Sequence, residues 1–124
     1  MARILVIDDD IDYLAMVKTF LVDAGYEVFP LLRADKALEE MRHLPPDLVI
    51  LDILMPGITG GQCYKAIRRE FGGLLPILIV TGTDITLKGV EDSNLKYLRK
   101  PVNLDTLLKA VRSMLPEEKP KDKK

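Results

Sequence analysis

Four aspartates lie within five positions near the start of the chain, at Asp8, Asp9, Asp10 and Asp12. They directly follow an apolar run, Ile4–Ile7. Carboxylates held this close repel one another and raise each other's pKa unless a cation joins them. Oxygen ligands of this kind suit a hard cation, above all Mg²⁺. The acidic run is therefore a candidate metal site, although its members, Asp10 best of all, could instead cap a following helix.

Three further groups with useful chemistry also stand at the ends of apolar runs. Asp52 comes after Leu48–Leu51, Thr81 after Ile77–Val80, and Lys100 after a shorter run. A carboxylate beside a bound metal can attack phosphorus and form an aspartyl-phosphate. Phosphoryl transfer depends mainly on positioning and on neutralisation of charge, which Mg²⁺ and Lys100 would supply. Thr81 could donate a hydrogen bond to a phosphoryl oxygen, so these residues together predict a phosphoacceptor site.

The apolar runs themselves predict β-strands. A run that is apolar at every position is typical of a strand covered on both faces, as in a parallel sheet between two layers of helices. Three runs have this pattern and two shorter segments are also strand-like; they are residues 4–7, 48–51, 77–80, 27–29 and 96–98.

Helical patterns separate these strands, with apolar residues at spacings of three and four. The predicted helices, in chain order, lie around Leu14–Leu21, Ala37–Met41, Cys63–Ile67, Asp84–Asn94 and Leu104–Leu115. Gly25 is placed to end the first helix, and Asn103 to cap the last. The order of elements predicts an α/β fold, a doubly wound five-stranded parallel sheet with helices on both faces, in a (βα)5 arrangement. Ligands of such sheets bind at the carboxyl ends of the strands, where the candidate site residues lie.

Composition and charge narrow the class of protein. The chain has 124 residues, 48% of them hydrophobic and 30% charged, which suits one globular domain at residues 1–116. The charged, proline-interrupted segment 117–124 is predicted to be disordered. A net charge of −1 argues against a nucleic-acid or membrane partner.

The single cysteine and the single histidine exclude some kinds of site. Cys63 alone cannot form an internal disulfide or a cysteine-rich zinc site, and we expect it to pack in the third helix. We expect His43 to be solvated rather than catalytic. The sequence contains neither the run of about 18 apolar residues that a membrane span needs nor a signal-peptide pattern at its start. These features predict a cytoplasmic protein.

Four segments together resemble the receiver domain of two-component response regulators, the CheY-like family. They occur in the family's order and all at strand ends: Ile4–Asp9, Leu48–Pro56, Ile77–Thr81 and Tyr97–Pro101. The resemblance covers nearly the whole chain. It implies a Mg²⁺-dependent phosphoacceptor that receives its phosphoryl group from a histidine of a partner kinase. Phosphorylation would then switch conformation and partner binding in phosphorelay signal transduction.

The resemblance also implies a role for each residue of the site. Asp52 matches the phosphoacceptor of the family. Lys100 matches the lysine that pairs first with the acceptor carboxylate and then with the phosphoryl group. Asp8 and Asp9 match the acids that hold Mg²⁺, together with Asp52 and the backbone carbonyl of Leu54. Such a domain would catalyse only its own phosphorylation and dephosphorylation.

Two residues match the family's conformational switch. The hydroxyl that matches Thr81 moves toward the phosphate, and the ring that matches Tyr97 turns inward. On the residues alone, Thr81 could also be an ordinary hydroxyl at a strand end, and Tyr97 a half-buried core ring. The bond that matches Lys100–Pro101 is cis in the family.

The resemblance implies protein partners as well. They are a sensor histidine kinase or phosphotransfer protein and a downstream protein target, and a homodimer is left open. Because the chain ends soon after the last predicted helix, we expect it to act by binding another protein or to be a receiver excised from a longer chain. It departs from the family before the fifth strand, where Asp92–Leu95 replaces the usual Gly-Ala pair.

Three other functions remain open from the sequence. Asp8–Asp10 contains the Asp-x-Asp pattern of haloacid-dehalogenase-like phosphohydrolases, but that family needs a further acidic pair. The aspartates that follow Lys100 are Asp105, in a predicted helix, and Asp122, in the tail. A degenerate receiver used only as a binding scaffold would not need the full site. A flavodoxin-like FMN protein would need a Gly/Ser/Thr-rich phosphate loop, which does not follow the first strand.

Overall fold

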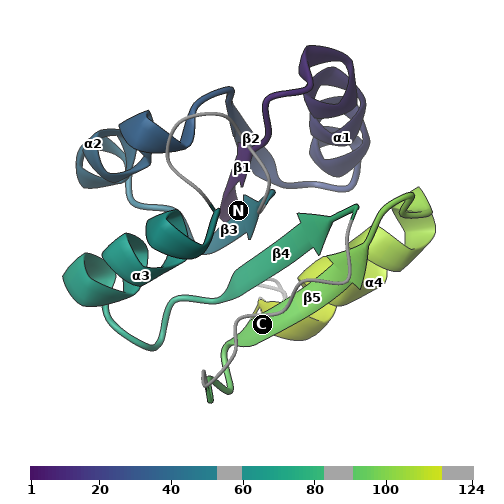
Figure 1. Cartoon of the computed structure of the whole chain (residues 1–124). Helices are drawn as coiled ribbons and strands as arrows, with labels where there is room; N and C mark the ends of the chain where they lie inside the picture. The colour runs from purple at the N-terminus through teal and green to yellow at the C-terminus, as the bar shows by residue number, and fades with distance from the viewer. Residues whose placement is uncertain (53–59, 83–90, 116–124) are drawn as a thin grey trace, which may run out of the picture.

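The computed structural model describes residues 1–52, 60–82 and 91–115. The elements in chain order are β1 (Arg3–Ile7), α1 (Ile11–Asp23), β2 (Glu27–Leu31), the 3-10 helix η1 (Ala34–Lys36), α2 (Ala37–His43), β3 (Leu48–Leu51), α3 (Gly60–Phe71), β4 (Ile77–Thr81), β5 (Leu95–Arg99) and α4 (Leu104–Met114). The strands form one parallel sheet in the order β2-β1-β3-β4-β5 (Figure 1). The predicted doubly wound α/β fold is confirmed.

Helices cover both faces of the sheet, as the fully apolar strands predict. Along β1, Ile4 and Val6 pack into one core cluster with residues of α1 and α4. Leu5 and Ile7 point to the other face and pack with residues of α2 and α3. Figure 1 shows these two pairs of helices on opposite sides of the sheet. Because side chains alternate along a strand, a strand apolar at every position supplies both clusters.

Local side chains decide where the helices next to the site begin. The carboxylate of Asp10 accepts hydrogen bonds from the N–H groups of Asp12 and Tyr13, both at 3.1 Å, and so caps α1. Asn103 caps α4 in the same way. Gly25 follows α1 with a φ of +104°, a conformation that residues with a Cβ rarely adopt. The capping roles predicted for Asp10 and Asn103 are confirmed.

The helix predicted within Asp84–Asn94 is wrong over its last residues. Residues 91–94 form a turn rather than a helix, while 83–90 lie outside the described residues. The Asp92 carboxylate accepts a hydrogen bond from the N–H of Asn94 at 2.9 Å, and its carbonyl accepts one from Leu95. This side-chain bond competes with helical pairing and favours a turn. Pro116 and the segment 117–124, which is predicted to be disordered, also lie outside the described residues.

No helix in the described ranges is long and apolar enough to cross a membrane.

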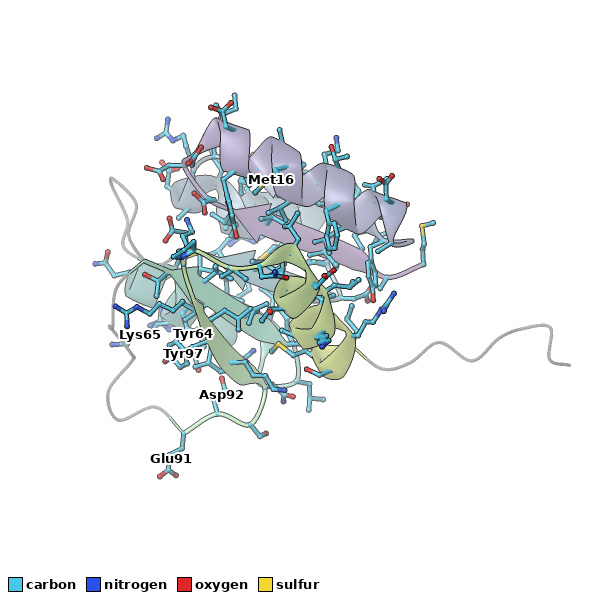
Figure 2. All side chains as sticks on the ribbon, turned by 90° about the vertical axis from the view of Figure 1, so that its right-hand side faces the viewer. Met16, Tyr64, Lys65, Glu91, Asp92 and Tyr97 are labelled. Atoms are coloured by element: carbon cyan, nitrogen blue, oxygen red, sulfur yellow. The ribbon has the colours of Figure 1, made fainter. Side chains whose placement is uncertain are left out.

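A cluster of Tyr64, Arg68 and Asp92 joins α3 to the start of β5. Arg68 Nε lies 2.8 Å from Asp92 Oδ2, and the Tyr64 hydroxyl donates to the same oxygen. The Arg68 guanidinium also donates to the carbonyl of Asn94 at 3.2 Å. Figure 2 shows Asp92 on the same side of the molecule as Tyr64, with Glu91 pointing away. The cluster therefore holds the chain at the point where β5 begins.

The charge of Asp92 stabilises the fold. Burial disfavours the ionised carboxylate, but the hydrogen bonds from Arg68, Tyr64 and the N–H of Asn94 outweigh it, so the pKa of Asp92 is lowered. A lowered pKa adds stability that is present above the ordinary aspartate value of about 3.9 and lost as the pH falls through the folded value. We expect Asp92→Asn to reduce the free energy of unfolding at pH 7 by about 2 kcal/mol, measured by urea denaturation.

Glu91→Gln is the matched control, because it removes the same charge from an exposed neighbouring residue. Its free energy of unfolding should stay within about 0.5 kcal/mol of the wild type. Equal losses in the two variants would show that net charge, not the cluster, accounts for the effect.

Candidate functional site

Sheet pairing continues past the ends of the strands and brings the predicted residues side by side. The N–H of Asp52 donates to the carbonyl of Ile7 at 2.9 Å, which sets Asp52 beside Asp8. The N–H of Lys100 donates to the carbonyl of Thr81 at 2.7 Å. The carboxyl ends of β1, β3, β4 and β5 therefore meet at one edge, as the fold predicts.

Burial separates these residues from other polar groups of the described chain. Asp8, Asp52 and Thr81, with exposed fractions of 2%, 7% and 3%, are the polar or charged residues that the described ranges bury. Burying a carboxylate is unfavourable unless a cation or hydrogen bonds compensate it. Because two carboxylates and a hydroxyl are buried at the same sheet edge, that edge is the candidate functional site.

Three carboxylates at this edge could share one metal ion. Asp8, Asp9 and Asp52 each offer an oxygen, and these oxygens lie within 4.8 Å of one another. Asp9 is exposed whereas the other two are buried, so the cluster opens to solvent on one side. Oxygen ligands with an open side fit Mg²⁺, which keeps several waters and binds phosphate oxygens. Leu54, the predicted carbonyl ligand, lies outside the described residues.

Lys100 supplies the positive charge of the site. Its Nζ lies 2.8 Å from Asp8 Oδ2 and 3.6 Å from Asp52 Oδ2. Burial opposes the ammonium charge, but the hydrogen bond to Asp8 and the charges of Asp8 and Asp52 outweigh it, so the pKa of Lys100 is raised. The lysine therefore stays protonated beside both carboxylates.

The aspartates of the acidic run have different structural roles. Asp10 caps α1, and its N–H donates to Asp8 Oδ1 at 3.0 Å, which fixes the buried carboxylate. Asp12 lies exposed in the first turn of α1. Capping therefore accounts for Asp10 but not for Asp8 or Asp9.

Tyr97 lies on β5 near the site. Its half-buried ring packs against the cluster formed with α2 and α3, which agrees with the core interpretation. Figure 2 shows it on the same side of the molecule as Tyr64.

The remaining sequence predictions concern residues away from the site. Cys63 is buried in α3, as predicted, and burial raises the pKa of its thiol to about 11, which disfavours the reactive thiolate. His43 is exposed at the end of α2, as predicted. Asp105 lies exposed in the first turn of α4 rather than at a strand end, where a hydrolase would need its further acidic pair. The Lys100–Pro101 bond is cis, as the resemblance implies.

Sequence reasoning missed one residue of the site, Tyr13. Its ring centroid lies 4.5 Å from Lys100 Nζ. Burial raises the pKa of the Tyr13 phenol, and the nearby carboxylates add to the effect against the opposing charge of Lys100. The signal in the sequence was slight: an aromatic residue one turn into the helix that follows the acidic run.

Comparison with known proteins agrees with this geometry. The model of the response regulator receiver domain family matches residues 4–112. Protein PilH of Pseudomonas aeruginosa is 31% identical over 119 residues, which cover 93% of this chain and 98% of PilH. The DNA-binding response regulator MtrA of Mycobacterium tuberculosis is 33% identical over 117 residues, covering 91% of this chain. The chain spans about half the length of MtrA, 50%.

Solved structures give the same result. The chemotaxis protein CheY4 of Vibrio cholerae matches with a TM-score of 0.84 at 35% identity, over 93% of this chain and 99% of that one. The response regulator TrrA of Thermotoga maritima, solved in complex with Mg(2+)-BeF, matches with a TM-score of 0.82 at 32% identity, over 93% of this chain and 100% of that one.

Proposed function

The chain belongs to the response regulator receiver domain family, whose members are phosphoacceptors of two-component signalling rather than classical enzymes, and from this premise we propose that Asp52 is the acceptor. The observation that carries the proposal is the position of Lys100, 2.8 Å from Asp8 and 3.6 Å from Asp52. One ammonium group there can serve the acceptor before transfer and the phosphoryl oxygens after it.

The reaction needs no general base, because the Asp52 carboxylate beside Lys100 is itself the nucleophile. One of its oxygens would form a bond to phosphorus while the bond from phosphorus to the donor histidine breaks, and the imidazole leaves with the electron pair. Lys100 then pairs with the oxygens of the new acyl phosphate. Hydrolysis by water would return Asp52 to its free state, which is the only turnover we assign to this chain.

We propose that Asp8, Asp9 and Asp52 hold Mg²⁺, with the carbonyl of Leu54 as a further ligand. The Mg(2+)-BeF complex of TrrA supports this assignment. When bound, the ion supplies positive charge for the phosphoryl oxygens. The protein provides the fixed carboxylates, since Asp8 is already held by the N–H of Asp10 and by Lys100.

We assign the switch to Thr81 and Tyr97. Thr81 ends β4, the strand next to β3, and its side chain is buried, so its hydroxyl could donate to a phosphoryl group on Asp52. The Tyr97 ring, on the neighbouring strand, packs on the core and can respond to that movement. Thr81→Ala should still accept a phosphoryl group, but the NMR signals of the Tyr97 ring should no longer shift on phosphorylation. If these signals shift in the variant as they do in the wild type, Thr81 is not part of the switch.

Membership of the family implies a histidine kinase or phosphotransfer protein as the phosphodonor. We place the protein in the cytoplasm, because a single cysteine that forms no internal disulfide fits a reducing compartment. The domain at residues 1–116 would carry the whole reaction, with 117–124 as a solvated tail.

Incubation with acetyl phosphate tests the proposed function. With Mg²⁺ present, we expect the mass of one phosphoryl group to be added, and hydroxylamine should remove it because acyl phosphates are labile to this nucleophile. Chelation of Mg²⁺ should reduce the labelling rate by at least about 100-fold. Absence of labelling by either acetyl phosphate or a phosphorylated kinase domain would support the scaffold interpretation. Steady release of phosphate from a generic monoester would support the hydrolase.

A further inference from the structure

Tyr13 lies beside the site without being one of the residues that the family resemblance names. It stands in the first turn of α1, and its backbone N–H is bound to the Asp10 cap. The cap thus fixes the start of the helix and with it the position of the ring. The ring faces Lys100 at a centroid distance of 4.5 Å, within the range of a cation–π contact.

The contact uses the ring of Tyr13 rather than its hydroxyl. The hydroxyl oxygen is buried and has no hydrogen-bond partner among the described residues. A buried hydroxyl without a partner is unfavourable, whereas the same ring without it would avoid that cost. The interaction with Lys100 therefore depends on the aromatic face.

The proposed function requires the Lys100 ammonium to interact with both Asp8 and Asp52, so its remaining contact should leave it able to move between them. Its Nζ donates to Asp8 at 2.8 Å but lies 3.6 Å from Asp52, beyond a good hydrogen bond. To serve the phosphoryl group, the ammonium must move toward Asp52. On the side of the ammonium that faces neither Asp8 nor Asp52, a hydrogen-bond acceptor would hold the group in place and oppose this movement. An aromatic face instead attracts the charge over a broad area.

We propose that Tyr13 is a positioning residue for Lys100. Its ring confines the ammonium between Asp8 and Asp52, shields that side from water and stays in contact as the ammonium moves toward the phosphoryl group. Shielding from water strengthens the attraction between the lysine and the negative oxygens. This inference rests on the proposed function, since it concerns the same transfer to Asp52.

Two substitutions separate the ring from the hydroxyl. Tyr13→Phe keeps the aromatic face, so its rate of labelling by acetyl phosphate with Mg²⁺ should stay within about twofold of the wild type. Tyr13→Leu removes the face, and the rate should fall by about fivefold to tenfold. Tyr13→Met replaces the ring with a flexible apolar chain and serves as a second variant if Leu packs poorly.

A spectroscopic measurement reports the contact without any reaction. The ring current of Tyr13 should shift the ε-methylene proton signals of Lys100 upfield in the wild type and in Tyr13→Phe, and the shift should vanish in Tyr13→Leu and Tyr13→Met. Mg²⁺ affinity should change by less than about twofold in all three variants, because Tyr13 contributes no ligand.

Tyr26→Leu is the control for general loosening of the core. Tyr26 packs against the same core cluster as Tyr13, just after the end of α1, and lacks the contact with Lys100. Its labelling rate should match that of the wild type.

Three outcomes would overturn the inference: an unchanged rate in Tyr13→Leu and Tyr13→Met, an equal loss in Tyr13→Phe, or an equal loss in Tyr26→Leu. Failure of the wild type to label would instead overturn the proposed function, and the two failures are thus distinguishable.

Discussion

The chain carrying Asp52→Asn is expected to acquire no hydroxylamine-labile phosphoryl group from acetyl phosphate, under conditions that label the wild type. The amide is a far weaker nucleophile toward phosphorus than the carboxylate, so labelling at this position should fall below detection. The substitution should not unfold the protein. It removes one of three carboxylates that repel one another, so without Mg²⁺ the free energy of unfolding should be unchanged or higher.

Asp10→Asn is the matched control for this experiment. It removes a neighbouring carboxylate of the same acidic run, but asparagine caps helices about as well as aspartate, so α1 should be retained. This variant should label at close to the wild-type rate. Labelling of Asp52→Asn at the wild-type level would mean that another residue is the acceptor. Peptide mapping by mass spectrometry would then identify that residue.

Lys100→Met is expected to have the second largest effect. Methionine keeps much of the length of the side chain and removes its charge, so the phosphoryl oxygens lose one fixed cation. We expect the labelling rate at saturating Mg²⁺ to fall by about 100-fold, the usual effect of removing one preorganised charge-stabilising group. The free energy of unfolding without Mg²⁺ should fall by about 2 kcal/mol, because Asp8 is buried and loses its partner.

The affinity for Mg²⁺ should change in the opposite direction. Removal of a cation that lies 2.8 Å from one proposed ligand favours a second cation at the same carboxylates, so Kd for Mg²⁺ should decrease. A variant that binds Mg²⁺ more tightly and labels more slowly cannot be explained by a damaged metal site. Weaker Mg²⁺ binding in Lys100→Met would contradict the electrostatic account.

The pKa of Lys100 adds a dependence on pH. Because its folded pKa is raised, the ion pair contributes stability fully below the ordinary lysine value of about 10.4 and loses it as the pH rises through the folded value. Lys100→Met should therefore lack the fall in the free energy of unfolding that deprotonation of Lys100 causes at alkaline pH. Lys96→Met is the control, since Lys96 lies exposed on β5, the strand that ends just before Lys100, and binds only Ser113 among the contacts described for it.

Much of the fold could be predicted because the secondary structure that each local pattern favours agrees with the fold that the elements form together. The runs Ile4–Ile7, Leu48–Leu51 and Ile77–Val80 can be covered only by helices on both faces, which requires parallel strands joined by helical crossovers. The segment Asp92–Leu95 could not be predicted in this way. The Asp92–Asn94 bond favours the turn locally, but the Arg68 guanidinium that also holds Asp92 and Asn94 comes from α3 and has no counterpart in the local pattern.

Part of the candidate site could also be predicted, since the carboxyl ends of parallel strands meet at one edge. This rule places Asp8, Asp52, Thr81 and Lys100 together without any structure. The rule does not say which aspartates of the acidic run belong to the metal-site cluster and which cap the helix, because Asp8 and Asp10 have the same side chain. The direction in which each points is decided by the end of β1 and the start of α1.

The sequence alone thus determined the class of fold, the strand ends and the residue types that meet there. The tertiary structure decided which atoms are in contact. Lys100 and Asp8 are 92 positions apart, and their 2.8 Å contact depends on the register of four strands. The ring of Tyr13 lies over Lys100 because the capped first turn of α1 packs next to the residue that follows β5. Local periodicity specifies the faces of single elements, whereas contacts between side chains follow from how those elements pack, which no short pattern in the sequence contains.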